Sequence, residues 1–177
     1  GTKFKVVFSL DNRYWAFKNP NANAGYEWES PAFTAPGAQG LDLGILSPDP
    51  ASENGKLAVL HLTYVRAKDF LEKNGDVQWW NKTLTVNWPG SSDFFSPWGW
   101  SLDLTNALAW DVVLHELGHA VMHGAMKSPN AGGQHKIDEC YSSKLAWSEG
   151  WATFFAAAVA LSPDDSDARF EFLVPRR

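Results

Sequence analysis

The chain has 177 residues, of which 45% are hydrophobic and 20% are charged, and its formal net charge is −5 at pH 7. This length suits one domain with its own core, and the acidic balance without a basic run excludes an electrostatic footprint for nucleic acid. No apolar run is long enough to span a membrane, and the single Cys140 excludes an internal disulfide bond.

The first part of the chain predicts strands followed by irregular structure. Residues 3–9 alternate and are rich in Val and Phe, which predicts a strand. Residues 14–17 are the expected hairpin partner of this strand, across a turn at Asp11 and Asn12. Residues 19–50 are dense in Pro, Gly, Asn and Ala, which is typical of a loop region with at most short strands.

The middle of the chain predicts one helix and two strands. Ser52 is a good N-cap for an amphipathic helix over residues 52–73, which ends at Asn74-Gly75. Residues 84–88 predict a buried strand, and residues 100–104 predict a second strand after a loop. We expect this second strand to be the sheet edge that pairs with an extended peptide. The residues expected to line a cleft beside it are Trp98, Trp100 and Leu102.

Residues 105–123 predict a helix that carries the pattern H-E-x-x-H, with Thr105 or Asn106 as its N-cap. His115 and His119 are four residues apart, so they share one helix face and can bind one metal ion together. Glu116 lies beside that ion without ligating it, where a general base is needed. The pattern therefore predicts a zinc site; the alternative is a surface helix with two ordinary histidines.

A second helix is predicted over residues 144–161, and Glu149 is the only charged residue between Lys144 and Pro163. An ionised carboxylate on an apolar helix needs a partner, which a metal ion would provide. The alternative is that Glu149 lies near the exposed helix N-terminus, where the helix dipole favours it. Thr153 lies four residues after Glu149, and Asp111 lies four residues before His115. Both are candidates to orient a ligand histidine by hydrogen bonding.

The segment from Trp147 to Ala152 reads W-S-E-G-W-A. This segment resembles the glutamate helix of the gluzincin metallopeptidases. Together with H-E-x-x-H it resembles the aminopeptidase and thermolysin-like catalytic cores of that clan. The resemblance implies an α+β, zincin-like fold, in which a small mixed sheet packs on a backing helix, the H-E-x-x-H helix and the glutamate helix. It also implies that one zinc ion is held by His115, His119 and Glu149, with Glu116 as the general base.

Other residues compete for roles at this site. Glu139 lies 20 residues after His119, closer to the thermolysin spacing, and Asp138 would suit an aspzincin-like site. We rank both below Glu149, because neither lies in matching family sequence. His123 lies eight residues after His115, or about 12 Å along a helix, which is too far for the same ion. The candidates to stabilise an oxyanion or to donate a proton are Tyr141, His135 and His123.

These observations predict a zinc-dependent metallopeptidase that hydrolyses peptide bonds with a Glu116-activated water. The alternatives are another zinc hydrolase, or a non-catalytic or structural zinc-binding module of a larger secreted protein. The expected partners are a peptide or protein substrate and further domains, with neither nucleic acid nor a membrane span. The ten Trp and the loops rich in Asn, Gly and Ser favour an extracellular or extracytoplasmic location.

The predicted domain organisation is simple. Residues 1–50 form a strand- and loop-rich segment of the same domain as residues 51–171, which the resemblance identifies as a zincin-like catalytic core. The C-terminal Leu-Val-Pro-Arg resembles a thrombin-cleavage linker, so we interpret residues 172–177 as a vector-derived tail.

Overall fold

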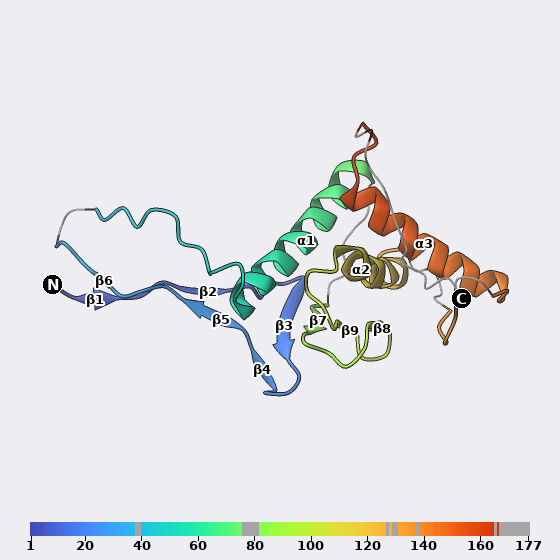
Figure 1. Ribbon diagram of the computed structural model, residues 1–177, viewed down its shortest axis with the longest axis horizontal. Helices are drawn as coiled ribbons and strands as arrows, with labels where there is room; N and C mark the ends of the chain where they lie inside the picture. The colour runs from blue at the N-terminus through green and yellow to red at the C-terminus, as the bar shows by residue number, and fades with distance from the viewer. Residues whose placement is uncertain are drawn as a thin grey trace.

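The computed structural model describes residues 1–37, 40–75, 82–126, 128, 131–136, 139–164 and 166. Over these residues the fold is α+β, as predicted, with small sheets and three helices, α1 (Glu53–Asn74), α2 (Trp110–Gly124) and α3 (Ser143–Ala160) (Figure 1). No helix in the described part of the chain is long and apolar enough to cross a membrane. The tail expected at residues 172–177 lies outside the described residues.

The main sheet is mixed and has the strand order β4-β3-β7-β9-β8. Its central strands β3 (Trp15–Asn19), β7 (Leu84–Asn87) and β9 (Ser101–Asp103) are parallel, whereas β4 (Ala24–Gly25) and β8 (Phe94–Ser96) run antiparallel at the two edges. The register aligns a row of apolar side chains across four strands, namely Phe17, Val86, Leu102 and Phe95.

Two predictions about the sheet are wrong. The strand near residues 14–17 does not form a hairpin with residues 3–9, because the side chain of Asn12 accepts hydrogen bonds from the main-chain N–H groups of Tyr14 and Trp15, and turns the chain into the main sheet. The strand near residues 100–104 is not an edge, because β8 covers it. With only three residues, β8 is too short to show an alternating pattern within its loop.

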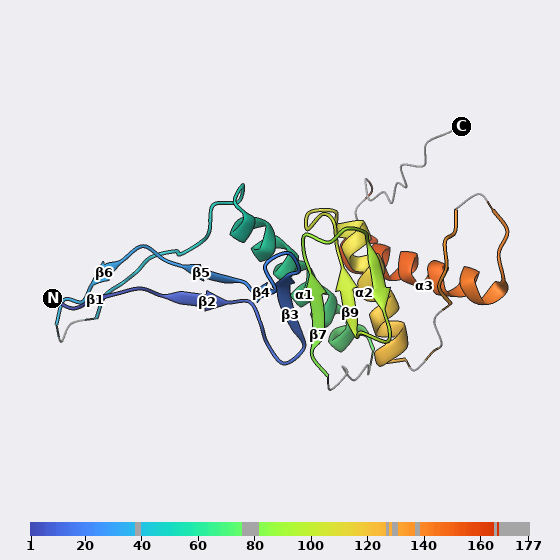
Figure 2. The same ribbon diagram turned by 90° about the horizontal axis from the view of Figure 1, so that it is seen from below.

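The predicted strand at residues 3–9 forms in two pieces, as one side of an N-terminal arm. Strand β1 (Lys3–Phe4) pairs with β6 (Phe33–Thr34), and β2 (Val7–Ser9) pairs with β5 (Glu27–Glu29), both antiparallel. Figures 1 and 2 show this two-stranded arm extending away from the helices, with the N-terminus at its tip. The arm carries two aromatic pairs, Phe4 with Phe33 and Phe8 with Trp28.

The core lies between the main sheet and helices α1 and α2. Helix α1 begins at its predicted cap, since the hydroxyl of Ser52 accepts a hydrogen bond from the N–H of Gly55 at 3.0 Å. The buried Tyr64 ring of α1 meets Trp15 and Phe17 of β3 edge-on, at 5.5 and 5.7 Å between ring centroids. Burial of such aromatic side chains fixes α1 on the sheet.

Helix α2 begins later than predicted, at Trp110, and Ala109 precedes it without a side-chain cap. Thr105 cannot act as the cap because its N–H and its hydroxyl both donate to the carboxylate of Asp93, at 2.7 and 2.8 Å. Asn106 instead accepts a hydrogen bond from the N–H of Leu108. Helix α2 follows this loop and lies above strands β7, β9 and β8 in the view of Figure 1, and α3 packs against α2.

Candidate metal centre

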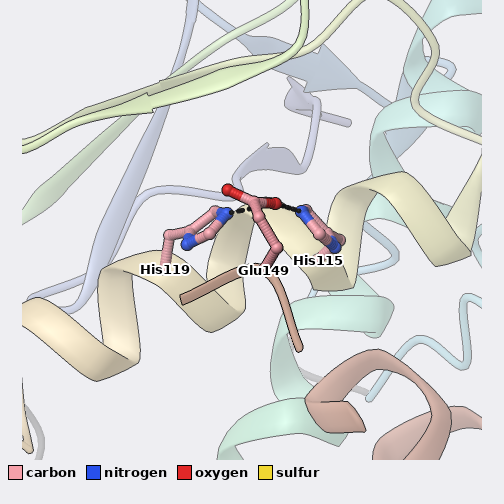
Figure 3. Close-up of side chains that lie close together, drawn as sticks. All are labelled: His115, His119 and Glu149. Atoms are coloured by element: carbon pink, nitrogen blue, oxygen red, sulfur yellow. Dashed lines mark hydrogen bonds and ion pairs between the residues drawn. The ribbon is translucent and has the colours of Figure 1, made fainter. Parts of the chain in front are cut away.

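The crossing of α2 and α3 brings His115, His119 and Glu149 together (Figure 3). Atom Oε2 of Glu149 lies 3.0 Å from Nε2 of His115 and 3.5 Å from Nε2 of His119. One ligand atom from each residue lies within 4.8 Å of the other two. In a tetrahedral zinc site with bonds of about 2.0–2.1 Å, neighbouring ligand atoms are roughly 3.3 Å apart. The spacing of these three groups therefore fits one zinc ion.

The two histidines are oriented by hydroxyl groups of α3. Nδ1 of His115 lies 3.3 Å from Oγ1 of Thr153, and Nδ1 of His119 lies 3.3 Å from Oγ of Ser148. An imidazole that donates its Nδ1–H to such a partner keeps the Nε2 lone pair for a metal. Ser148 was not predicted from the sequence; its only signal is a small polar residue next to Glu149 on an apolar helix. The partner of His115 that the structure provides is Thr153 and not Asp111.

The electrostatics of the cluster suit a cation. Burial by itself raises the pKa of Glu149, but hydrogen bonds from His115 and His119, and their charge, outweigh it and lower this pKa to about 2. Glu149 is therefore ionised at neutral pH. His119 is only 8% exposed, so its Nε2 and the Glu149 carboxylate meet where water competes weakly.

Glu116 lies beside the cluster but is not one of its three members. Burial raises the pKa of Glu116 to about 7, helped by the negative charges of Glu149 and Asp93 and opposed by His115 and by a hydrogen bond from the main chain of Phe95. The Glu116 carboxylate thus lies in hydrogen-bonding contact with strand β8, and both line the same groove.

This groove is lined by β8, by the loop at residues 131–135 and by the metal cluster. Trp98 lies on its wall with its side chain 97% exposed. The other two expected cleft residues lie elsewhere. Leu102 is fully buried in the core, and the buried Trp100 donates its indole N–H to the carbonyl of Lys82.

The remaining candidates are distributed around the centre. Nε2 of His135 lies 3.2 Å from Oε2 of Glu149, so this loop histidine reaches the cluster. The Tyr141 hydroxyl donates to Glu139 at 2.9 Å instead, in a hollow that Glu149 also lines. His123 packs against Phe95 and Trp100, outside the cluster.

The alternative third ligands do not join the two helix histidines. Glu139 is exposed, and it pairs with Lys136 at 2.7 Å and with Tyr141. Asp138 lies outside the described residues. Glu149 is the acidic residue that forms the cluster in the described part of the chain.

Comparison with known protein families matches residues 73–171 to the mycolysin C-terminal domain. The match covers more than half of the chain and contains the whole of α2 and α3, and with them the metal cluster. No curated protein and no solved structure matches the chain significantly.

This match corrects three predictions. The assignment to the gluzincin catalytic core is wrong, because the matching family is a non-catalytic C-terminal domain of larger peptidases. The predicted metallopeptidase function and the classification as an enzyme are wrong for the same reason. The family match favours the alternative of a non-catalytic module. The two motifs led to the wrong function because the spacing of His115, His119 and Glu149 indicates only that a metal ion can bind. This spacing does not show whether one coordination position of the ion stays open for a reaction. The chain belongs to the mycolysin C-terminal domain family.

Proposed function

We propose that this chain is a non-catalytic zinc-binding module of a larger peptidase, and that His115, His119 and Glu149 hold one zinc ion. The observation that carries the proposal is the convergence of three ligand atoms within 4.8 Å of one another. Two imidazole nitrogens and one carboxylate oxygen form a donor set typical of zinc. The bound ion would supply a cross-link between α2 and α3.

The physical reason for such a cross-link lies in the apolar character of α3. This helix carries Glu149 and Lys144 as its only charged residues, and Glu149 is half-buried against α2. Without a cation the carboxylate depends on two imidazoles for compensation, which must be protonated to carry charge. A zinc ion would compensate the carboxylate at neutral pH while the histidines stay neutral.

The wider setting follows from the family. A C-terminal domain is one part of a larger chain, so the peptide or protein substrate expected from the sequence would be cleaved by another part of that peptidase. We also propose an extracellular location, which the composition favours and the peptidase context supports. The zincin-like label for the arrangement of sheet and helices stays a prediction.

The test is the metal content of the purified chain by elemental mass spectrometry after mild dialysis. We expect about one zinc per chain in the wild type, and loss of zinc in Glu149→Gln. Glu139→Gln is the matched control, since Glu139 is an exposed glutamate on the neighbouring loop, and it should keep the ion. A wild type without zinc would contradict the proposal.

The non-catalytic part of the proposal has its own measurement. The zinc-loaded chain is incubated with a peptide library and the products are read by mass spectrometry. We expect no cleavage. Cleavage by the wild type that Glu116→Gln abolishes at unchanged zinc content would overturn the non-catalytic assignment.

A further inference from the structure

A third histidine approaches the centre from the loop at residues 131–136. Nε2 of His135 lies 3.2 Å from Oε2 of Glu149, the same oxygen that lies 3.0 and 3.5 Å from the Nε2 atoms of His115 and His119. Three imidazole nitrogens of the same type therefore surround one carboxylate oxygen. Each of the three distances is close to the spacing of roughly 3.3 Å between neighbouring ligand atoms of a tetrahedral zinc site.

The ring of His135 is also prepared for ligation. Its Nδ1 lies 3.0 Å from the carbonyl oxygen of Gly133, which can only accept, so the Nδ1–H donates and Nε2, which faces Glu149, is the nitrogen left to bind a metal in the neutral ring. Gly133 has φ = +136°, a conformation that residues with a side chain rarely adopt, and this turns its carbonyl back toward the ring. The Nδ1 atoms of His115 and His119 are held in a similar way, by the hydroxyl groups of α3.

We propose that His135 is the fourth protein ligand, which closes the zinc site. The inference rests on the proposed function, in which the helix residues provide the first three ligands. A structural zinc site takes four protein ligands, whereas a catalytic site keeps one position open. Closure by His135 thus explains how the ligands expected of a catalytic centre serve in a non-catalytic domain.

Closure requires a small movement of the loop. His135 is not among the residues whose ligand atoms all lie within 4.8 Å of one another, so its Nε2 must come closer to the helix histidines when the ion binds. Its side chain is 38% exposed, and Gly132 and Gly133 precede it, where an added Cβ would meet nothing within 4 Å. The ring can therefore shift without displacing core residues.

The experiment compares the wild type with His135→Ala, and uses His123→Ala as the matched control, because His123 packs on Phe95 and Trp100 outside the cluster. Zinc affinity is measured by competition with a chromophoric chelator. We expect His135→Ala to bind zinc at least about tenfold more weakly, since loss of even an outer partner of a ligand typically costs about 10–100-fold. The control should bind as the wild type does.

A second readout reports the coordination directly. The zinc is replaced by Co²⁺, whose visible absorption reports the number of ligands, and azide is titrated in. The wild type should show no response to azide because no position is open, and His135→Ala should respond. If both proteins bind zinc equally well and respond equally to azide, the fourth ligand is refuted and the three-ligand site stands. If the wild type binds neither metal, the proposed function fails as well.

Discussion

The indole N–H of Trp151 donates to the main-chain carbonyl of Gly118 at 3.1 Å, which joins α3 to α2 next to His119 in the sequence of α2. Gly118 leaves no room for a side chain at this crossing. A Cβ added there would lie 3.0 Å from Cα of Ala152 and 3.2 Å from Cδ1 of Phe155. The close approach of the two helices therefore sets the distance between the histidines of α2 and Glu149 of α3.

Gly118→Ala should push α3 away from α2, because the obstructing atoms include main chain that cannot rotate aside. We expect a destabilisation of about 1–3 kcal/mol, the usual cost of overpacking, together with weaker zinc binding. Denaturant unfolding and a zinc competition titration measure the two effects. Gly150→Ala is the control, since a Cβ there meets nothing within 4 Å, and it should stabilise α3. Equal behaviour of the two variants would contradict the packing argument.

Thr153→Val should weaken zinc binding roughly 10–100-fold without unfolding the protein, because it removes the hydroxyl beside Nδ1 of His115 at nearly constant volume. The affinity is read by chelator competition. Thr63→Val makes the same change on α1, where the hydroxyl only donates to the carbonyl of Val59. An equal loss of affinity in both variants would show that the hydroxyl of Thr153 does not orient His115.

Glu116 should make the metal-free protein less stable as the pH rises. Its pKa in the folded chain is raised from 4.5 to about 7, so its contribution to the free energy of unfolding is full below pH 4.5 and is lost as the pH rises through about 7. Glu116→Gln should remove this loss, and the variant should gain stability over the wild type between pH 5 and 8. Denaturant unfolding in the presence of a chelator measures the difference at each pH. A constant difference across this range would refute the raised pKa.

Removal of zinc should lower the stability of the wild type. At a free zinc concentration 100 times the dissociation constant, binding adds about 2.7 kcal/mol to the free energy of unfolding. Thermal unfolding with and without a chelator should show the corresponding shift of Tm. In Glu149→Gln the shift should disappear, and a shift of the same size in this variant would place the ion elsewhere.

The sequence predicts the helices well because their signals are local. Ser52 caps α1 as predicted, and its side chain accepts the expected hydrogen bond. The structure also shows Ser142 as the cap of α3, which was not predicted from the sequence. The facing of His115 and His119 is likewise local, since it needs only four residues of helix.

The rest depends on contacts between distant parts of the chain. Strand β3 pairs with β7, whose partner residues lie 69 positions further along the chain, and no local sequence pattern identifies such a partner. Ser148 and His135 enter the centre only because α3 crosses α2 at Gly118 and because a loop returns over Glu149. The motif reports only that an ion can bind, and the assignment of catalysis was overturned by the family match and not by any local signal.

The N-terminal arm has a consequence for the dynamics of the molecule. Its strand residues are absent from the buried core over the described part of the chain, and its ladder is held by main-chain hydrogen bonds, two partly exposed aromatic pairs and the exposed ion pair of Lys5 with Glu29. Amide protons of the arm should therefore exchange with solvent through local opening, whereas those of α2 and the inner strands await global unfolding. We therefore expect the arm and the helical core to open as two separate cooperative units, so that an ion bound between α2 and α3 would slow exchange in only one of them.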